Sequence, residues 1–225
     1  MKYYFFIMIS LSLLYGCSAS LIRIKTIPDQ ETYSMFGKTP ERVFYSSNNI
    51  GDTLFKKWEN DVNGGFANSS VTVYGGYVFV GDLSGRIFCF NDTTGKVMGK
   101  LKYKGAVFSA PVIDKTNVIF IVVSENSDES NLISYNFVTG KENYDKEIKG
   151  KILTEIIKKD SSIVFNSEDG RVFRYTVNGD KIWQLETGSF THSSPALDNN
   201  IIVFGNDEGE LVAVSYNNGK LIYRK

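Results

Sequence analysis

The chain has 225 residues, 42% of them hydrophobic and 14% aromatic, which is enough apolar material for the core of one sizeable domain. Its 25 Lys and Arg balance 25 Asp and Glu, so no overall field attracts it to nucleic acid or to acidic substrates. The 20 Gly and 4 Pro fit a β-rich chain with many tight turns, and the abundance of aromatic residues excludes intrinsic disorder.

The first residues predict a leader peptide. Lys2 precedes a mostly apolar run, Tyr3 to Leu14, which is too short to span a bilayer and has the length of a signal-peptide core. The run ends in "LYGC", which resembles the bacterial lipobox, in which the Cys is acylated and becomes the first residue after cleavage. We therefore expect a lipoprotein signal peptide over 1–16 and lipidation at Cys17. A plain signal peptide or a buried Cys is the alternative.

Residues 17–52 are expected to form a tether and a segment that precedes the repeats. The polar stretch "TIPDQETYS" (26–34) would hold the folded part away from the lipid surface. Two or three acyl chains on Cys17 would anchor the chain stably. The residue after Cys17 is Ser18 and not Asp. In enteric bacteria, the resemblance to lipoproteins with this feature implies sorting to the outer membrane. The expected location is therefore the bacterial cell envelope, at the outer membrane and facing the periplasm.

A repeat of about forty residues follows. Turn glycines recur in "NDTTGK", "NFVTGK", "TVNGDK" and "SYNNGK", namely Gly95, Gly140, Gly179 and Gly219. An aromatic residue stands four positions after three of them, at Tyr144, Trp183 and Tyr223, whereas the first repeat has Gly99 there. The pattern predicts four units, at about 61–103, 104–147, 148–186 and 187–225.

Each unit contains four short runs rich in Val, Ile, Phe and Tyr, separated by turn residues, which is typical of β-strands. The second runs, such as "YVFVG" (77–81) and "NIIVFG" (200–205), are apolar on both faces, so both sides must be covered. No helical stripe is present to cover them. Four-stranded sheets stacked face to face would do so, and we therefore predict an all-β chain, a β-propeller of four-stranded antiparallel blades over 53–225.

The strand inventory predicts an incomplete ring. The run "TLFKKWEN" (53–60) has the character of an outer strand, with Trp58 in the place that Trp183 and Tyr223 hold in their units. Its three inner partner strands are missing. We expect about four complete blades, the N-terminal arc of a longer propeller, with apolar faces that promote self-association. A closed four-bladed ring is the alternative.

The segments "VFVGDLSGRIFCFNDTTGK" (78–96) and "IVFGNDEGELVAVSYNNGKLIY" (202–223) resemble the repeat of the PQQ-type (quinoprotein-like) β-propeller family, and the resemblance covers about 33–225. In that family such aromatic and glycine motifs dock one blade on the next. The resemblance therefore implies structural blade-docking roles for the following residues: Trp58, Gly95, Gly140, Tyr144, Gly179, Trp183, Gly219 and Tyr223.

This family includes dehydrogenases, which hold pyrroloquinoline quinone and usually Ca²⁺ in the central funnel. It also includes non-catalytic scaffolds, among them the lipoprotein BamB of the outer-membrane barrel-assembly machinery. The enzymes need catalytic and metal-binding carboxylates and an aromatic floor, and many add a vicinal disulfide. Here Cys89 has no neighbouring Cys and is expected to be a small buried hydrophobic residue. We predict the non-catalytic branch, without cofactor or metal; a quinoprotein dehydrogenase fragment and a carbohydrate- or cell-surface-binding module are alternatives.

Other candidate residues indicate little chemistry. His192 in "FTHSSP" is expected to be a turn or rim residue rather than a base, with no assignable partner. The loop "SENSDES" (124–130) carries Glu125, Asp128 and Glu129 but lacks the alternating oxygen ligands and central Gly of a Ca²⁺ loop. The expected partners are the membrane, through acylated Cys17, and other proteins; no nucleic acid and no small-molecule substrate are expected.

Overall fold

The structure is a computed structural model that describes residues 21–25, 33–45, 47, 51–67 and 71–225. Cys17 and the stretch 26–32 lie outside the described residues. All regular secondary structure in the described part is β, arranged as four antiparallel sheets of four strands each. Among these residues no helix is long and apolar enough to cross a membrane.

Each sheet is built from four strands that are consecutive in the sequence, so each is a meander. The first two blades are β1 (Thr72–Tyr74), β2 (Tyr77–Gly81), β3 (Arg86–Asn91), β4 (Val97–Lys102), and β5 (Val112–Asp114), β6 (Asn117–Val123), β7 (Glu129–Asn136), β8 (Lys141–Lys149). The last two are β9 (Ile157–Lys159), β10 (Ser162–Asn166), β11 (Arg171–Thr176), β12 (Lys181–Glu186), and β13 (Ala196–Asp198), β14 (Ile201–Gly205), β15 (Leu211–Ser215), β16 (Leu221–Arg224).

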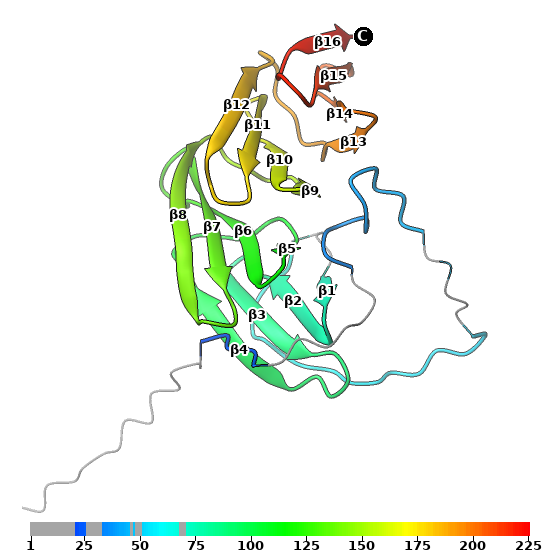
Figure 1. The fold of residues 1–225 in the computed structure, drawn as a ribbon, viewed down its shortest axis with the longest axis vertical. Helices are drawn as coiled ribbons and strands as arrows, with labels where there is room; N and C mark the ends of the chain where they lie inside the picture. The colour runs from blue at the N-terminus through cyan, green and yellow to red at the C-terminus, as the bar shows by residue number, and fades with distance from the viewer. Residues whose placement is uncertain (1–20, 26–32, 46, 48–50, 68–70) are drawn as a thin grey trace, which may run out of the picture.

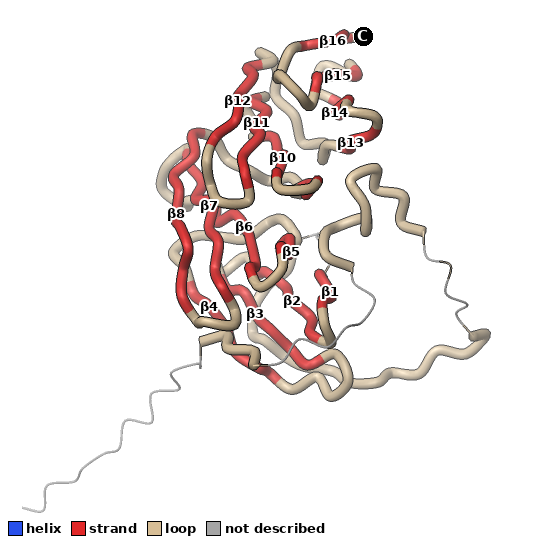
Figure 2. Tube along the Cα trace, viewed as in Figure 1, coloured by secondary structure: helices blue, strands red, loops and turns tan. Residues whose placement is uncertain are grey.

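The four blades follow one another along an open arc (Figure 1). The short first strands β1, β5, β9 and β13 lie on the concave side, and the outer strands lie on the convex side. The first and fourth blades stand at opposite ends of the arc, and Figure 2 shows that the strands of each blade are joined by turns and loops. The predicted all-β propeller of about four blades in an incomplete ring is confirmed, and the closed four-bladed ring is not formed.

The core consists of the layers between neighbouring blades. Phe79 and Phe120 are fully buried between the first two blades, Ile119 and Phe165 between the second and third, and Ile202 lies between the last two. Ile119 and Phe120 are adjacent in β6 and face opposite neighbours, because successive side chains of a strand point to opposite faces. This explains why the second strand of a blade is apolar on both sides.

Residues 53–60 do not form the predicted outer strand. No strand is assigned there, and Leu54 and Phe55 are more than four-fifths exposed. A strand requires a ladder of backbone hydrogen bonds with a neighbour, and none of the described strands pairs with this run. Trp58 and Asn60 hold the run to the first blade; the Asn60 side-chain amide donates to the Gly95 carbonyl at 2.7 Å.

Residues 21–25 differ from the expected tether. Ile22 and Ile24 are fully buried between the outer parts of the first and second blades. The Ile24 backbone N–H donates to the Phe137 carbonyl at 2.7 Å, and the Tyr135 hydroxyl donates to the Ile22 carbonyl at 3.0 Å. Residues 21–25 are therefore packed into the propeller, because their alternating Ile residues match an apolar gap between two sheets.

Candidate functional site

Two tryptophan side chains cover turn glycines: Trp58 attaches the run 53–60 to the first blade, and Trp183 joins the third blade to the fourth. The Trp58 ring covers Gly95 so closely that a Cβ there would lie 2.7 Å from it, and Trp183 covers Gly219 at the same distance. The indole N–H of Trp58 donates to the Asp92 carbonyl at 2.8 Å, and that of Trp183 to the Tyr216 carbonyl at 2.9 Å. Glycine is required at these turns by its positive φ and by the absence of a side chain under the ring.

A tyrosine makes the equivalent contact between the second and third blades. A Cβ at Gly179 would lie 3.0 Å from the Tyr144 ring, and the Tyr144 hydroxyl donates to the Val177 carbonyl at 3.2 Å. Burial raises the pKa of this phenol well above its usual value. Six of the predicted blade-docking residues therefore lie together in the fold as three aromatic and glycine contacts.

The seam between the first and second blades is built differently. Gly99 stands where the other blades carry an aromatic residue, and a Cβ there would lie 2.8 Å from the backbone of Ile22. The Arg23 side chain covers the turn at Gly140, the position that an aromatic ring covers in the other seams. The segment 21–25 therefore takes the place of the missing ring, which sequence reasoning did not predict although Gly99 marked the gap.

The outward face of the fourth blade has no covering layer among the described residues. Val203, Ala213 and Tyr223 are cross-strand neighbours on it, flanked by Ile201 and Leu211 two positions along their strands. Ile201, Leu211 and Tyr223 are 36%, 45% and 44% exposed. We call these five residues the open face. Tyr223 occupies the position of Trp183, yet within the described chain it meets no turn glycine.

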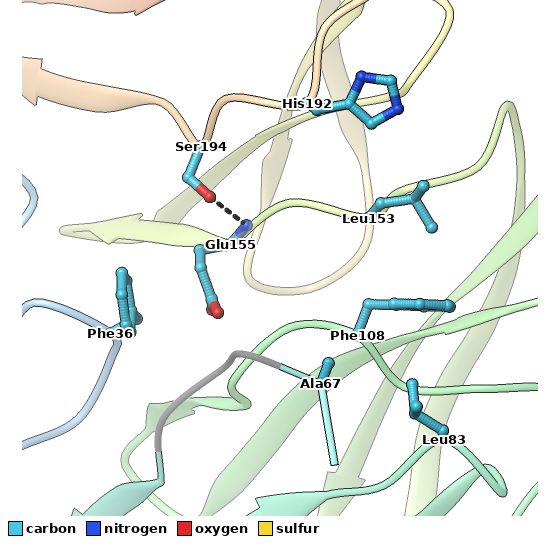
Figure 3. Close-up of a pocket in the computed structure, with 8 residues that line it drawn as sticks. All are labelled: Phe36, Ala67, Leu83, Phe108, Leu153, Glu155, His192 and Ser194. Carbon is cyan, nitrogen blue, oxygen red and sulfur yellow. Dashed lines mark hydrogen bonds between the residues drawn. The ribbon is translucent and has the colours of Figure 1, made fainter. Parts of the chain in front are cut away.

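The concave side holds a cavity of about 480 Å³, which Figure 3 shows in close-up. Glu155 is 7% exposed there, and its Oε2 accepts a hydrogen bond from the Ala110 N–H at 2.8 Å. Its own backbone N–H donates to the Ser194 hydroxyl at 3.1 Å. Burial raises the pKa of Glu155 to about 7, against the opposing effects of the Ala110 N–H and the Arg42 charge. The lining residues are Phe36, Ala67, Leu83, Phe108, Leu153, Glu155, His192 and Ser194.

The segment 33–42 runs along the inner edges of the blades, and we call it the strap. It pairs with the first blade through Tyr33 and Val73, accepts from the Ile113 N–H of the second blade through the Ser34 carbonyl, and accepts from the Leu197 N–H of the fourth blade through the Pro40 carbonyl. The two carbonyl contacts are both 2.9 Å long. The strap therefore connects distant blades across the concave side.

Arg42 fixes the end of the strap. Its guanidinium donates to three backbone carbonyls, those of Pro195 at 2.5 Å, Phe36 at 3.1 Å and Glu155 at 3.2 Å. Burial lowers its pKa to about 10, and the nearby Glu155 charge opposes this shift. The residue adopts a positive φ of 55°, which is unfavourable for a side chain with a Cβ and is offset by these hydrogen bonds.

His192 lies at the rim, as predicted, and it has partners that the sequence did not reveal. Its Nδ1 is 2.9 Å from Asp207 Oδ2, and its Nε2 is 3.2 Å from Glu168 Oε1. Desolvation lowers its pKa, but the hydrogen bonds to Asp207 and Glu168 outweigh this effect and hold the pKa above its usual value. A protonated His192 thus bridges carboxylates of the third and fourth blades.

The remaining candidates have structural surroundings. Cys89 is fully buried, and burial raises the pKa of its thiol to about 12, so it is an inert core residue. In the loop 124–130, Glu129 accepts from the Ser127 hydroxyl at 2.9 Å, and Asp128 lies 3.8 Å from the Lys151 ammonium. Across the described ranges, no group of three or more acidic, His or Cys side chains is placed to hold a metal ion.

Comparison with protein families identifies the family to which the chain belongs. Residues 51–128 and 120–225 match the family described as outer membrane protein assembly factor BamB. The chain belongs to this family. A search of curated proteins found no match.

Solved structures show the same fold at low sequence identity. BamB from Moraxella catarrhalis is 17% identical with a TM-score of 0.60, and the alignment covers 75% of this chain and 51% of that one. The computationally designed Ika8 protein is 18% identical with a TM-score of 0.59, covering 69% and 48%. A europium-containing methanol dehydrogenase is 12% identical with a TM-score of 0.60, covering 69% and 41%. The chain thus spans about half the length of the BamB structure.

Proposed function

We propose that this chain is a non-catalytic, lipid-anchored β-propeller scaffold that binds protein partners in the bacterial cell envelope. Acylated Cys17 would hold it at the outer membrane, facing the periplasm, and its task would lie in outer-membrane protein assembly. Membership of the BamB family and the BamB-like fold support this assignment. Stacked blades give a rigid base on which edges and loops present binding surfaces.

The open face carries the proposal. It presents Ile201, Leu211 and Tyr223 to solvent at positions that are covered by the next blade elsewhere in the arc. A contiguous apolar surface that includes an exposed aromatic residue, here Tyr223 on the outer strand β16, is typical of a protein-binding site, because aromatic side chains dominate interface energies. The partner is therefore expected to bring an apolar, sheet-like surface.

The side chains of the concave cavity support a structural role. The carboxylate of Glu155 is held by the Ala110 N–H, and the guanidinium of Arg42 is held by three carbonyls. The carboxylate thus links the second and third blades, and the guanidinium links the strap to the third and fourth. Residues committed to such contacts are poorly placed to move protons or to bind a substrate, which favours a scaffold over an enzyme.

The test uses the gene in its own host. Deletion should lower the level of outer-membrane β-barrel proteins, and the wild-type gene should restore it. Leu211→Asp places a charge in the open face and should fail to restore it. Ile182→Asp is the matched control, because Ile182 is similarly exposed, at 43% against 45%, but lies on β12 outside the open face. Full restoration by Leu211→Asp, or no effect of the deletion, would refute the proposal.

Membrane attachment is tested separately. The wild-type chain should incorporate labelled palmitate and fractionate with membranes, whereas Cys17→Ser should do neither. Palmitate incorporation by Cys17→Ser would rule out Cys17 as the lipidation site.

A further inference from the structure

The packed segment Leu21–Lys25 determines which side of the propeller is nearest to the lipid anchor. We propose that the outer edge of the first blade, together with this segment, lies against the anionic phospholipid headgroups of the bilayer. The inference rests on the proposed acylation of Cys17. A propeller attached in this way has a defined orientation on the membrane, whereas a long tether would let it rotate freely.

The first argument is reach. Only residues 18–20 separate Cys17 from Leu21, and a chain of four residues spans at most roughly 14 Å when fully extended. Leu21 is itself fixed, since its carbonyl and the backbone of Ile22 pack against Gly99 of β4. An acylated Cys17 has its acyl chains in the membrane, so β4 must lie within this short distance of the headgroups.

The packed segment is held firmly by its three central residues. Ile22 and Ile24 are at most 1% exposed. Arg23, between them, extends over the turn at Gly140 on the second blade. Figure 1 shows the segment beside β4 on the convex side of the arc. The point where the chain leaves the propeller is therefore the outer seam between the first two blades.

The second argument is charge. The stretch 96–104, which contains β4, carries four lysines and no acidic residue, and the packed segment adds Arg23 and Lys25. All six side chains are exposed or half-exposed. We call them the basic edge: Arg23, Lys25, Lys96, Lys100, Lys102 and Lys104. The outer strand β8 of the next blade is balanced, with three lysines against three acidic residues.

The basic edge is complementary to an anionic leaflet. Attraction between basic side chains and anionic lipids decays within a Debye length, about 8 Å at physiological ionic strength, so it acts only when the edge is held close. The short connection to Cys17 would hold it there. Two acidic groups have described contacts beside it: Glu142 accepts from the Tyr103 hydroxyl at 2.7 Å, and Asp92 accepts from the Thr93 hydroxyl at 2.9 Å.

The inference is tested by lysine footprinting of the full chain in its native membranes. A water-soluble acetylating reagent is applied to intact membranes and to the same protein after solubilisation in a neutral detergent, and each lysine is quantified by mass spectrometry. Lys96, Lys100, Lys102 and Lys104 should react about threefold more slowly in membranes. Lys181 and Lys220, on the outer parts of the third and fourth blades, should react equally in both states. Membrane-bound protein with equal ratios at all six lysines would overturn the inference.

A charge-reversal variant makes the test specific. Lys96→Glu, Lys100→Glu and Lys104→Glu together should abolish the protection of Lys102 while palmitate labelling persists, whereas Lys181→Glu with Lys220→Glu should leave it intact. Persistent protection in the triple variant would also overturn the inference. A chain that takes up no palmitate and stays soluble refutes the acylation of Cys17, so the palmitate readout separates that failure from failure of the orientation.

Discussion

The backbone of Ile22 packs directly on Gly99, the one position in the four repeats where glycine replaces the seam aromatic. The N-terminal segment thus supplies what the first repeat lacks. The two sites are 77 residues apart in the sequence. The glycine at residue 99 leaves room for the backbone of Ile22, and the segment around Ile22 fills the space that an aromatic residue at 99 would occupy.

Gly99→Val tests this relationship. A Cβ at residue 99 would lie 2.8 Å from the Ile22 Cα and N, so the segment must shift or leave the seam. We expect a loss of about 1–3 kcal/mol in the free energy of unfolding, measured by urea denaturation. Gly51→Ala is the control, since nothing lies within 4 Å of a Cβ there. Equal stability of the two variants would contradict the packing.

Trp183 and Tyr223 occupy equivalent positions with different surroundings. Trp183 covers Gly219 and donates to a carbonyl, whereas Tyr223 is 44% exposed. Trp183→Ala should cost about 3 kcal/mol of unfolding free energy, and Tyr223→Ala less than about 1 kcal/mol. Guanidinium denaturation followed by circular dichroism measures both. Similar losses would mean that Tyr223 is covered in solution.

Glu155 should make stability depend on pH. Its pKa is raised from 4.5 to about 7 in the fold, so the folded state retains a proton that the unfolded state releases between these values. The free energy of unfolding should therefore decrease as the pH rises from 4.5 to 7, by up to roughly 3 kcal/mol. Glu155→Gln, which keeps an acceptor for Ala110, should flatten this part of the profile. An unchanged profile in the variant would refute the assignment.

His192 should act in a higher pH window. Its folded pKa lies above its ordinary value of 6.5, so its stabilisation is complete below pH 6.5 and is lost as the pH rises through the folded pKa. The side chain is 56% exposed, so the effect is limited by solvent screening to about 0.5 kcal/mol. Thermal unfolding of wild type and His192→Gln at pH 6 and pH 8.5 measures it. A larger difference between the two proteins at pH 8.5 than at pH 6 would have the wrong sign.

The open face should promote self-association of the isolated chain. Exposed apolar sheet faces associate in water, so the purified protein is expected to form dimers or larger species by size-exclusion chromatography with light scattering. Leu211→Asp should shift it to the monomer, whereas Ile182→Asp should not. A wild-type monomer at 50 μM, on the order of a typical weak dimerisation constant, would count against an accessible apolar face.

The repeat was predictable because its signals are local. Turn glycines such as Gly95 and Gly219 mark the hairpins. The strand around Phe120 is apolar on both faces, which indicates that another sheet covers each face. These features depend on a few neighbouring residues, so the pattern predicts strands, blades and stacking without knowledge of distant contacts.

The remainder depends on contacts between distant residues. The apolar alternation of 21–25 is too short to indicate a partner, and the three-carbonyl environment of Arg42 has no sequence signature. The opposite error occurred at 53–60, where strand-like composition is present without a neighbouring strand to pair with. Composition indicates what a segment is able to form, and the available neighbours decide whether it forms.

The strap has a consequence for biosynthesis. The Pro40 carbonyl accepts a hydrogen bond from the Leu197 N–H, so this attachment point of the strap does not exist until the fourth blade has been synthesised. The strands of one blade are close together in the sequence, so blades can form and stack while translation continues. The contact between Pro40 and Leu197 joins residues far apart in the sequence and therefore forms later. The strap therefore holds the curvature of the described arc only after the fourth blade is in place.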